Sequence, residues 1–259
     1  LIPSFLLQDV IQERINLSEK VKAELYTQWG GNQVVSGPVL NIPFTITEQE
    51  ENGLTTRERN GVAHFLPESL AADGVLFPES RKRGIYEVVV YESKLRLSGT
   101  FLQPDVSTLD LQDSRYNWGS AYFTIGISDM RGIKNMPELV INGQKCSVEP
   151  GVADTDLFGS GITVKAGSID LHQTMNFEIE LVLNGSEDLS LEALGKTSAI
   201  TLKSDWTQPA FTGGFLPVNR QVSAEGFTAD WQVTHLNRNF PQQWIDGKYT
   251  TRDAKLGVE

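Results

Sequence analysis

The sequence predicts a mainly β protein, a large antiparallel β-sandwich with a helix at its N-terminus. Three features indicate this fold. Most of the chain alternates apolar and polar residues in short runs, which is the pattern of half-buried strands. Glycine, proline and asparagine separate the runs, as expected of turns in an all-β domain. Helical spacing of apolar residues occurs in one substantial segment near the N-terminus. No linker interrupts the remainder, so residues 31–259 are predicted to form one β-rich domain.

The segment from Phe5 to Gln28 is predicted to form one long helix. Its apolar residues are spaced by three, by four or by sums of these, which places them along one stripe. They are Leu7, Val10, Ile11, Ile15, Val21 and Leu25. Trp29-Gly30-Gly31 is predicted to end the helix, since paired glycines release the backbone into a turn.

The first residues, Leu1 to Leu7, are almost all apolar. They are too few to cross a bilayer, which needs about 20 residues. We expect them to be the end of a transmembrane anchor, so that residues 1–30 form a membrane-proximal helix. The alternative is an apolar helix start packed into a core. The chain also stops in mid-pattern at Glu259, and both ends suggest the middle portion of a longer protein.

Strands follow in order through the first half of the chain. We expect them at Gln33–Thr47, Val62–Leu66, Gly74–Phe77, Gly84–Tyr91 and Lys94–Phe101, with a polar loop or hairpin tip at Glu48–Asn60. Prolines such as Pro43 indicate edge strands or strand ends, because proline cannot donate to a ladder. Two similar phrases, Leu66-Pro67-Glu68-Ser69 and Phe77-Pro78-Glu79-Ser80, are both predicted to be turns.

The second half continues in the same style. The predicted strands are Tyr122–Ile127, Glu138–Ile141, Lys145–Val148, Ile162–Val164, Met175–Leu183, Thr197–Lys203, Ala210–Leu216 and Phe227–Leu236. Asn142-Gly143 lies between two of them and is a strong signal for a type I′ hairpin turn.

Composition and motifs exclude several classes of function. The formal net charge is −11, which argues against a nucleic-acid partner, because such proteins concentrate Lys and Arg on one face. Cys146 is the sole cysteine, so neither an intrachain disulfide nor a cysteine-based zinc site can form. His64, His172 and His235 lack metal spacing, and Asp154-Thr155-Asp156 lacks the further ligands of a calcium loop. No nucleophile elbow occurs. We therefore expect no enzyme, no catalytic residue, no metal and no cofactor.

Two segments are candidates for binding. The basic run Arg81-Lys82-Arg83 could hold a phosphate or carboxylate through Arg81 and Arg83, or it could be a solvated strand entry beside Glu79 and Glu87. The aromatic residues Trp206, Phe211 and Phe215 lie in a Gly/Pro-rich segment. They could form a stacking platform for a sugar or a lipid, or the plug that closes one end of the sandwich.

An ordered set of phrases resembles one known family. The phrases are Trp29-Gly30-Gly31 with Gln33, Ser36-Gly37-Pro38-Val39-Leu40, Leu66-Pro67-Glu68, Arg83 to Val88 with Tyr91, Leu97-Ser98-Gly99, Ser128-Asp129 with Arg131-Gly132-Ile133, Asn184-Gly185-Ser186-Glu187, Gly213 to Pro217, Phe227 to Trp231 and Phe240 to Trp244. Together they resemble the CreD family of inner-membrane, cell envelope integrity proteins. No single phrase is diagnostic, but their order is specific and runs from about Leu1 to Trp244.

The resemblance implies a location and a role. It implies an anchor helix, a large periplasmic domain and further transmembrane helices downstream, in the bacterial inner membrane. It also implies a link to the CreBC-controlled response and to tolerance of envelope-targeting agents such as some colicins and β-lactams. It supplies no catalytic residue or ligand.

We therefore expect a non-catalytic periplasmic domain that acts as a scaffold or sensor in envelope integrity and stress response. Its partners would be the membrane, through the flanking helices, and an envelope protein. The alternative is a lipid- or glycan-binding domain that serves the membrane helices, with Trp206 and its neighbours as the binding surface.

Overall fold

The computed structural model describes residues 4–49, 56–83, 85–109, 111, 114–167 and 169–259. One helix, α1 (Ser4–Trp29), precedes a series of strands. The strands are β1 (Gln33–Gln49), β2 (Thr56–Phe65), β3 (Ser69–Arg83), β4 (Tyr86–Phe101), β5 (Arg115–Tyr116), β6 (Tyr122–Ile127), β7 (Glu138–Ile141), β8 (Gln144–Cys146), β9 (Val148–Pro150), β10 (Gly161–Lys165), β11 (Met175–Ser186), β12 (Leu189–Glu192), β13 (Thr197–Ser204), β14 (Phe211–Gly213), β15 (Asn219–Ser223), β16 (Gly226–Thr234), β17 (Gln243–Ile245) and β18 (Lys255–Val258). Short 3-10 helices occupy Val106–Leu109, Trp118–Ser120, Met130–Gly132, His235–Asn237, Asp246–Lys248 and Arg252–Ala254.

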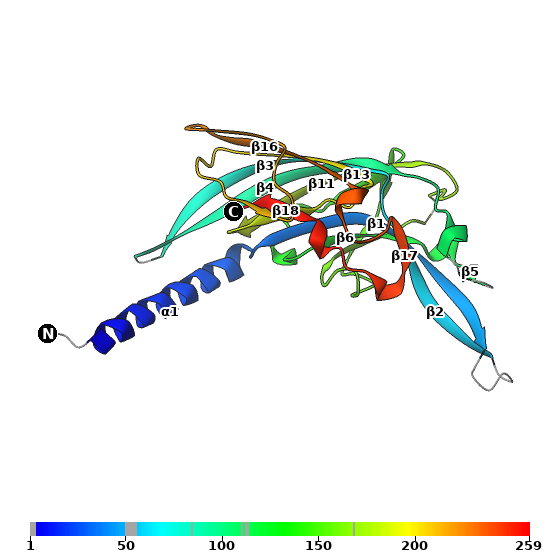
Figure 1. The fold of residues 1–259 in the computed structure, drawn as a ribbon, viewed down its shortest axis with the longest axis horizontal. Coiled ribbons are helices and arrows are strands. Elements are labelled where there is room, and N and C mark those ends of the chain that lie inside the picture. Colours follow the sequence, from blue (N-terminus) through cyan, green and yellow to red (C-terminus); the bar gives the residue numbers. More distant parts are fainter. Residues whose placement is uncertain (1–3, 50–55, 84, 110, 112–113, 168) are drawn as a thin grey trace.

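The strands form two sheets that pack face to face, which confirms the predicted sandwich and its N-terminal helix (Figure 1). The first sheet has the order β14-β18-β12-β1-β6-β10-β9, with β2, β5 and β17 joined to it through β1 and β2. The second sheet has the order β15-β16-β13-β3-β4-β11-β7-β8. Most pairs are antiparallel, but β1 runs parallel to β12 and β3 runs parallel to β13. Alternation in the sequence carries no information about strand direction, so these two pairs could not be predicted.

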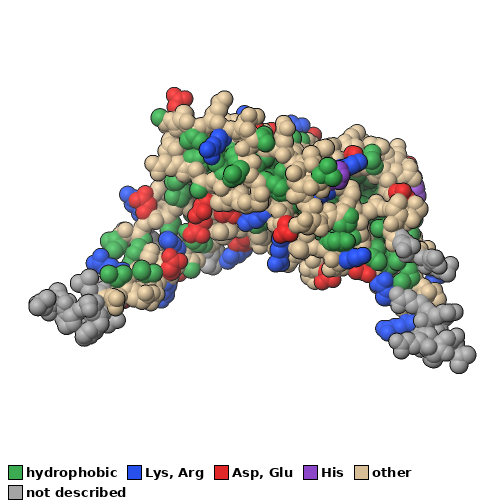
Figure 2. All heavy atoms as spheres, in the orientation of Figure 1, with side chains coloured by type: hydrophobic (Ala, Val, Ile, Leu, Met, Phe, Trp, Pro, Cys, Tyr) green, Lys and Arg blue, Asp and Glu red, His purple; other side chains and the backbone are tan. Residues whose placement is uncertain are grey.

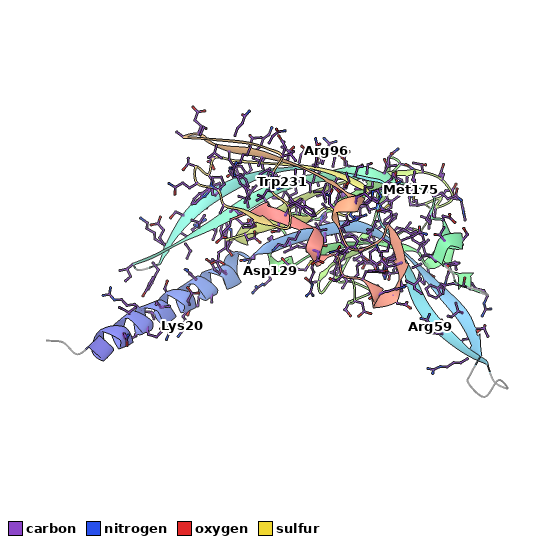
Figure 3. The ribbon with its side chains drawn as sticks, viewed as in Figure 1. Lys20, Arg59, Arg96, Asp129, Met175 and Trp231 are labelled. Atoms are coloured by element: carbon purple, nitrogen blue, oxygen red, sulfur yellow. The ribbon has the colours of Figure 1, made fainter. Side chains whose placement is uncertain are left out.

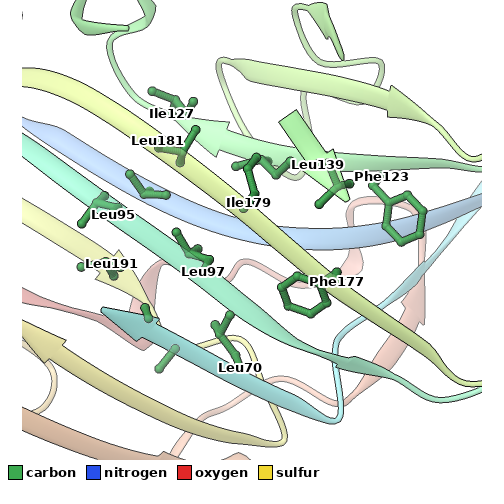
Figure 4. Close-up of a cluster of buried hydrophobic side chains, with 14 of the residues drawn as sticks. Leu70, Leu95, Leu97, Phe123, Ile127, Leu139, Phe177, Ile179, Leu181 and Leu191 are labelled. Atoms are coloured by element: carbon green, nitrogen blue, oxygen red, sulfur yellow. The ribbon is translucent and has the colours of Figure 1, made fainter. Parts of the chain in front are cut away.

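The core lies between the two sheets because alternate residues of each strand face inward. In β11 the inward side chains include Phe177, Ile179 and Leu181, and they meet Leu97 of β4 (Figure 4). Aromatic rings join the two sheets at Phe101 of β4 and Phe123 of β6, whose centroids are 5.5 Å apart, and Phe177 of β11 lies 5.3 Å from Phe101 within the same sheet. A second, smaller cluster that includes Phe158, Phe240 and Trp244 packs around Val39 and Leu194.

One of the two similar phrases predicted to be turns lies inside a longer strand. The phrase Phe77-Pro78-Glu79-Ser80 is part of β3 and pairs with β4, so its prediction as a turn was wrong. Beyond Leu76, β3 pairs with β4 alone, because its pairing with β13 ends there. Pro78 therefore sits at a strand edge, where a missing N–H is tolerated. The other phrase, Leu66 to Ser69, does connect β2 to β3.

Two hairpins are longer than the sequence predicts. The ranges Gly84–Tyr91 and Lys94–Phe101 were predicted as separate strands, but β4 is continuous from Tyr86. In the predicted loop or hairpin tip at 48–60, the described residues are strand, since β1 reaches Gln49 and β2 begins at Thr56, while residues 50–55 lie outside the described residues. In contrast, β6 and β7 have the predicted bounds, and both residues of the Asn142-Gly143 turn have positive φ as type I′ requires. The strand after this turn, predicted at Lys145–Val148, is instead β8 at Gln144–Cys146, and Val148 begins β9.

The molecule has two projecting arms. Helix α1 extends from the body in one direction, accompanied by the outer part of the β3–β4 hairpin, and the β1–β2 hairpin extends in the opposite direction (Figure 1). Viewed as a surface, the arms and the body form an arch (Figure 2). The point where α1 meets the body is therefore the place where a movement of the helix would reach the sandwich.

Candidate functional site

A cleft of about 270 Å³ lies where α1 meets the body, and we call it the junction cleft. The end of α1, the outer part of the β3–β4 hairpin, the β11–β12 turn and the C-terminal strand surround it. The lining residues are Lys22, Tyr26, Leu76, Pro78, Glu87, Val88, Val89, Tyr91, Glu187, Ser204, Trp206, Phe227, Val258 and Glu259.

The floor of the junction cleft is apolar. Leu76, Phe227 and Val258 are all at least nine-tenths buried, and each comes from a different strand. Leu76 of β3 and Phe227 of β16 are both register partners of Ser204 in β13, so their side chains lie on the same face of the sheet. Such a floor suits an apolar ligand, because buried aliphatic surface offers no hydrogen bonds.

The rim is polar and joins the helix to the turn between β11 and β12. The hydroxyl of Tyr26 donates to Oε1 of Glu187 at 2.7 Å. Burial, reinforced by this carboxylate, raises the pKa of Tyr26 well above its usual value, so the phenol stays protonated. Glu187 has φ of 59°, a left-handed conformation that is uncommon outside glycine. The tight turn thereby brings its carboxylate against the helix.

Helix α1 ends at a glycine that no other residue could replace without strain. Gly30 has φ of +122°, and a Cβ there would lie 2.8 Å from the backbone oxygen of Asn184. Its N–H donates to the carbonyl of Tyr26 at 2.9 Å, and its own carbonyl accepts from Ser186 Oγ at 2.9 Å. The helix end is therefore seated directly on the β11–β12 turn.

The next residues are held by Asp129, which lies at the junction of α1 and β1 (Figure 3). The N–H of Gly31 donates to Asp129 Oδ2 at 2.9 Å, and Arg131 donates to the same carboxylate from its side chain. These bonds, with Arg131 the largest contributor, lower the pKa of Asp129 to about 2. Gln33 donates to the carbonyls of Asp129 and Asn184 and completes this set of contacts, which we call the joint between α1 and β1. Three phrases that carry the CreD resemblance thus converge on one joint.

The structure places the predicted aromatic residues in two different environments. Trp206 lines the junction cleft, with its Nε1 donating to the carbonyl of Gln208 at 2.9 Å. Phe211 packs edge-on against Phe227 and Trp231, and the carbonyl of Phe215 accepts from Trp231 Nε1 at 3.1 Å. The aromatic segment therefore packs against the core and contributes Trp206 alone to the cleft lining.

The predicted basic residues lie beside the helix end. The guanidinium of Arg81 stands 4.6 Å from the ring centroid of Trp29 and forms an ion pair with Glu79 at 2.8 Å. The backbone of Arg83 closes β3, and its side chain lies outside the described residues. Arg81 therefore supports the joint between helix and arm, next to the junction cleft.

Other titratable groups are buried for structural reasons. His64 is buried between Asn41, at 2.7 Å from its Nδ1, and Asp154, at 3.4 Å from its Nε2, and burial lowers its pKa. His172 and His235 are exposed. Within the described ranges, no group of three His, Cys, Asp or Glu side chains is arranged to hold a metal.

Sequence reasoning missed most of the junction cleft. Lys22 and Tyr26 lie in α1, about 160 residues before Glu187 in the chain, and nothing in the sequence indicates that these residues meet. One signal was present: Tyr26 and Trp29 are three residues apart in the last turns of the helix and therefore share a face. Two large aromatic side chains on that face indicate a docking surface.

Comparison with known proteins now gives the family. The sequence model of the family described as "Inner membrane protein CreD" matches residues 1–259. The chain belongs to the CreD family. It is 35% identical to Inner membrane protein CreD of Escherichia coli strain K12 over an alignment of 254 residues. The alignment covers 96% of this chain and 56% of that protein.

The CreD comparison confirms the resemblance on which the sequence analysis relied. The chain spans about half the length of this CreD relative, whose name gives a membrane location and no reaction. In the described residues no helix combines the length and the apolar character needed to cross a bilayer.

Proposed function

We propose that this chain is the non-catalytic periplasmic domain of an inner-membrane cell envelope integrity protein, and that it acts as a sensor or scaffold in the response to envelope stress. Membership of the CreD family supports the membrane location. The observation that supports the proposed role is a difference along α1: its C-terminal end contacts the body, whereas residues 11–17 are exposed.

The C-terminal end of α1 is docked on the body. Trp29 donates through Nε1 to the carbonyl of Tyr91 at 3.2 Å, and Tyr26 binds Glu187 as described above. Further toward the N-terminus, residues 11–17 are all exposed, including Ile11 at 51% and Ile15 at 48%. A helix fixed at one end to a rigid sandwich transmits a tilt of the sandwich along its whole length. In this proposal the helix carries the state of the domain toward the membrane.

Location and role need separate tests in the full-length protein in cells. For location, Glu225→Cys in a Cys146→Ser background is expected to react with a membrane-impermeant maleimide before the inner membrane is broken. Reaction only after lysis would contradict a periplasmic domain.

To test the role, Trp29→Ala is expected to abolish tolerance of an envelope-targeting β-lactam, because the change uncouples α1 from the sandwich. Full tolerance at an unchanged protein level in the membrane would contradict signalling through α1, and Val222→Ala on exposed β15 is the matched control.

A second candidate function is favoured by the junction cleft itself. An aliphatic floor beside a helix end is suited to a lipid-like ligand, and it suits a glycan poorly because sugar hydroxyls would lose hydrogen bonds there. The domain would then bind an apolar ligand and serve the membrane helices. Native mass spectrometry of the gently purified chain tests this role. An extra mass that is retained in the wild type and lost in Val89→Trp, which fills the cleft, is expected, and a clean apo mass would count against it.

A further inference from the structure

The volume of the junction cleft limits what it can hold. At about 270 Å³ it is close to the lower end of the range of small-molecule pockets, about 300 Å³. Its floor consists of buried aliphatic and aromatic side chains, among them Leu76, Phe227 and Val258. This combination suits a single alkyl chain, which gains by leaving water and needs no hydrogen bond.

The rim of the cleft carries an excess of negative charge. Of its four ionisable side chains other than tyrosine, three are carboxylates and one is the ammonium of Lys22. That ammonium is held by Glu19 at 3.1 Å, outside the cleft lining. Glu87 accepts from the hydroxyl of Ser80 and lies 3.6 Å from Lys82.

The other two carboxylates lack this compensation. Glu187 accepts from the neutral hydroxyl of Tyr26, and in the described part of the chain neither Glu187 nor Glu259 forms an ion pair with a basic side chain. Two uncompensated carboxylates at the mouth of an apolar cleft attract a cationic group and repel an anionic one.

Aromatic rings at the same place favour the same charge. Tyr26 and Trp206 both line the cleft, in addition to Phe227 in its floor. The face of an aromatic ring attracts ammonium groups, and it does so most strongly for tryptophan. The neighbouring joint already uses this interaction, since Arg81 lies over Trp29. Carboxylates and aromatic faces together are the side chains that bind quaternary ammonium groups.

We propose that the junction cleft binds a cationic amphiphile, with its alkyl chain on the floor formed by Leu76, Phe227 and Val258 and its ammonium head between Glu187, Glu259 and Trp206. This inference rests on the second candidate function, which requires an apolar ligand in the cleft, and it adds the charge of the head group.

Three probes with alkyl chains of equal length separate two claims: that the cleft binds an apolar ligand, and that it prefers a cationic head group. Decyltrimethylammonium, decanoate and decyl maltoside are titrated against the 259-residue chain below their critical micelle concentrations, with Trp fluorescence and calorimetry as readouts. We expect decyltrimethylammonium to bind about tenfold more tightly than decyl maltoside, and decanoate to bind more weakly than either. Equal affinities, or tighter binding of decanoate, would overturn the cationic preference and leave the apolar cleft in place. Failure of all three to bind would overturn both claims.

Matched variants locate the site. Glu187→Gln combined with Glu259→Gln is expected to remove about tenfold of the affinity for decyltrimethylammonium and to leave decyl maltoside binding unchanged. Glu225→Gln, in the exposed β15–β16 turn, is the charge control. Val89→Trp is expected to abolish binding of both probes, whereas Val222→Trp on exposed β15 is not. If Val89→Trp binds normally while remaining folded by circular dichroism, the ligand lies elsewhere and the proposal is wrong.

Discussion

The guanidinium of Arg81 lies 4.6 Å from the ring centroid of Trp29, so the outer part of the β3–β4 hairpin is fastened to the last turn of α1. The indole of Trp29 is only partly exposed, and its Nε1 donates to the carbonyl of Tyr91 in β4. One side chain thus joins the helix to both strands of the hairpin. The helix and this hairpin form one arm because of these contacts.

Trp29→Ala is expected to loosen that arm. The change removes a cation–π contact, a hydrogen bond and a large apolar surface, so the free energy of unfolding should fall by about 2 to 3 kcal/mol. Urea unfolding measures this loss. Hydrogen exchange should also become faster in α1 and in the outer part of β4, while the central strands β6 and β11 keep their protection. A uniform increase across both sheets would show that Trp29 supports the whole fold and not the arm.

Gly99 is expected to tolerate no side chain. It lies in β4, where a Cβ would come within 2.0 Å of the carbonyl oxygen of Ser69 and 2.8 Å of the ring of Phe177. Since a backbone carbonyl cannot move aside cheaply, Gly99→Ala should lower the free energy of unfolding by about 2 to 4 kcal/mol. Gly159→Ala is the control, because a Cβ there meets nothing within 4 Å. Thermal and urea unfolding should leave this control within about 0.5 kcal/mol of the wild type.

Local patterns in the sequence predicted the elements, whereas long-range contacts decided their lengths and the site. The helical spacing predicted α1, and Asn142-Gly143 predicted its hairpin, because both signals act within a few residues. Pro78 was wrongly predicted to lie in a turn. Its neighbours in the sequence do not reveal that the pairing of β3 with β13 ends at Leu76, which leaves Pro78 at a strand edge. The junction cleft was missed for the same reason, since Tyr26, Glu187 and Val258 meet only after both sheets have formed.

Asp129 is expected to make the joint sensitive to acid. Its pKa is lowered from 3.8 to about 2 in the folded protein. A carboxyl group with a lowered pKa stabilises the fold above its unfolded pKa, and this contribution is lost as the pH falls from about 4 toward 2. Asp129→Asn should therefore cost about 1 to 2 kcal/mol at pH 6, and the difference from wild type should shrink as the pH approaches 2.

Urea unfolding of both proteins at a series of pH values measures this linkage. Asp73→Asn, the same change at an exposed position of β3, is the control variant. A constant difference between wild type and Asp129→Asn across the series would mean that the carboxylate charge has no part in holding Gly31 and Arg131.

Glu192 is expected to show the opposite dependence. This side chain is 6% exposed, and burial is the largest cause of its raised pKa. The Glu192 carboxyl group therefore releases its proton at a lower pH in the unfolded chain than in the folded protein. It costs stability as the pH rises above 4.5, the ordinary pKa of a glutamate side chain.

Glu192→Gln removes the charge and keeps an oxygen that can accept from Thr251 Oγ1, which lies 2.6 Å from Glu192 Oε2. The variant should be more stable than the wild type at pH 7 by about 1 kcal/mol, with the difference vanishing near pH 4. Unfolding titrations at these two pH values test this, and a variant that is less stable at pH 7 would show that Arg252 and Lys255 compensate the buried carboxylate more than its burial costs.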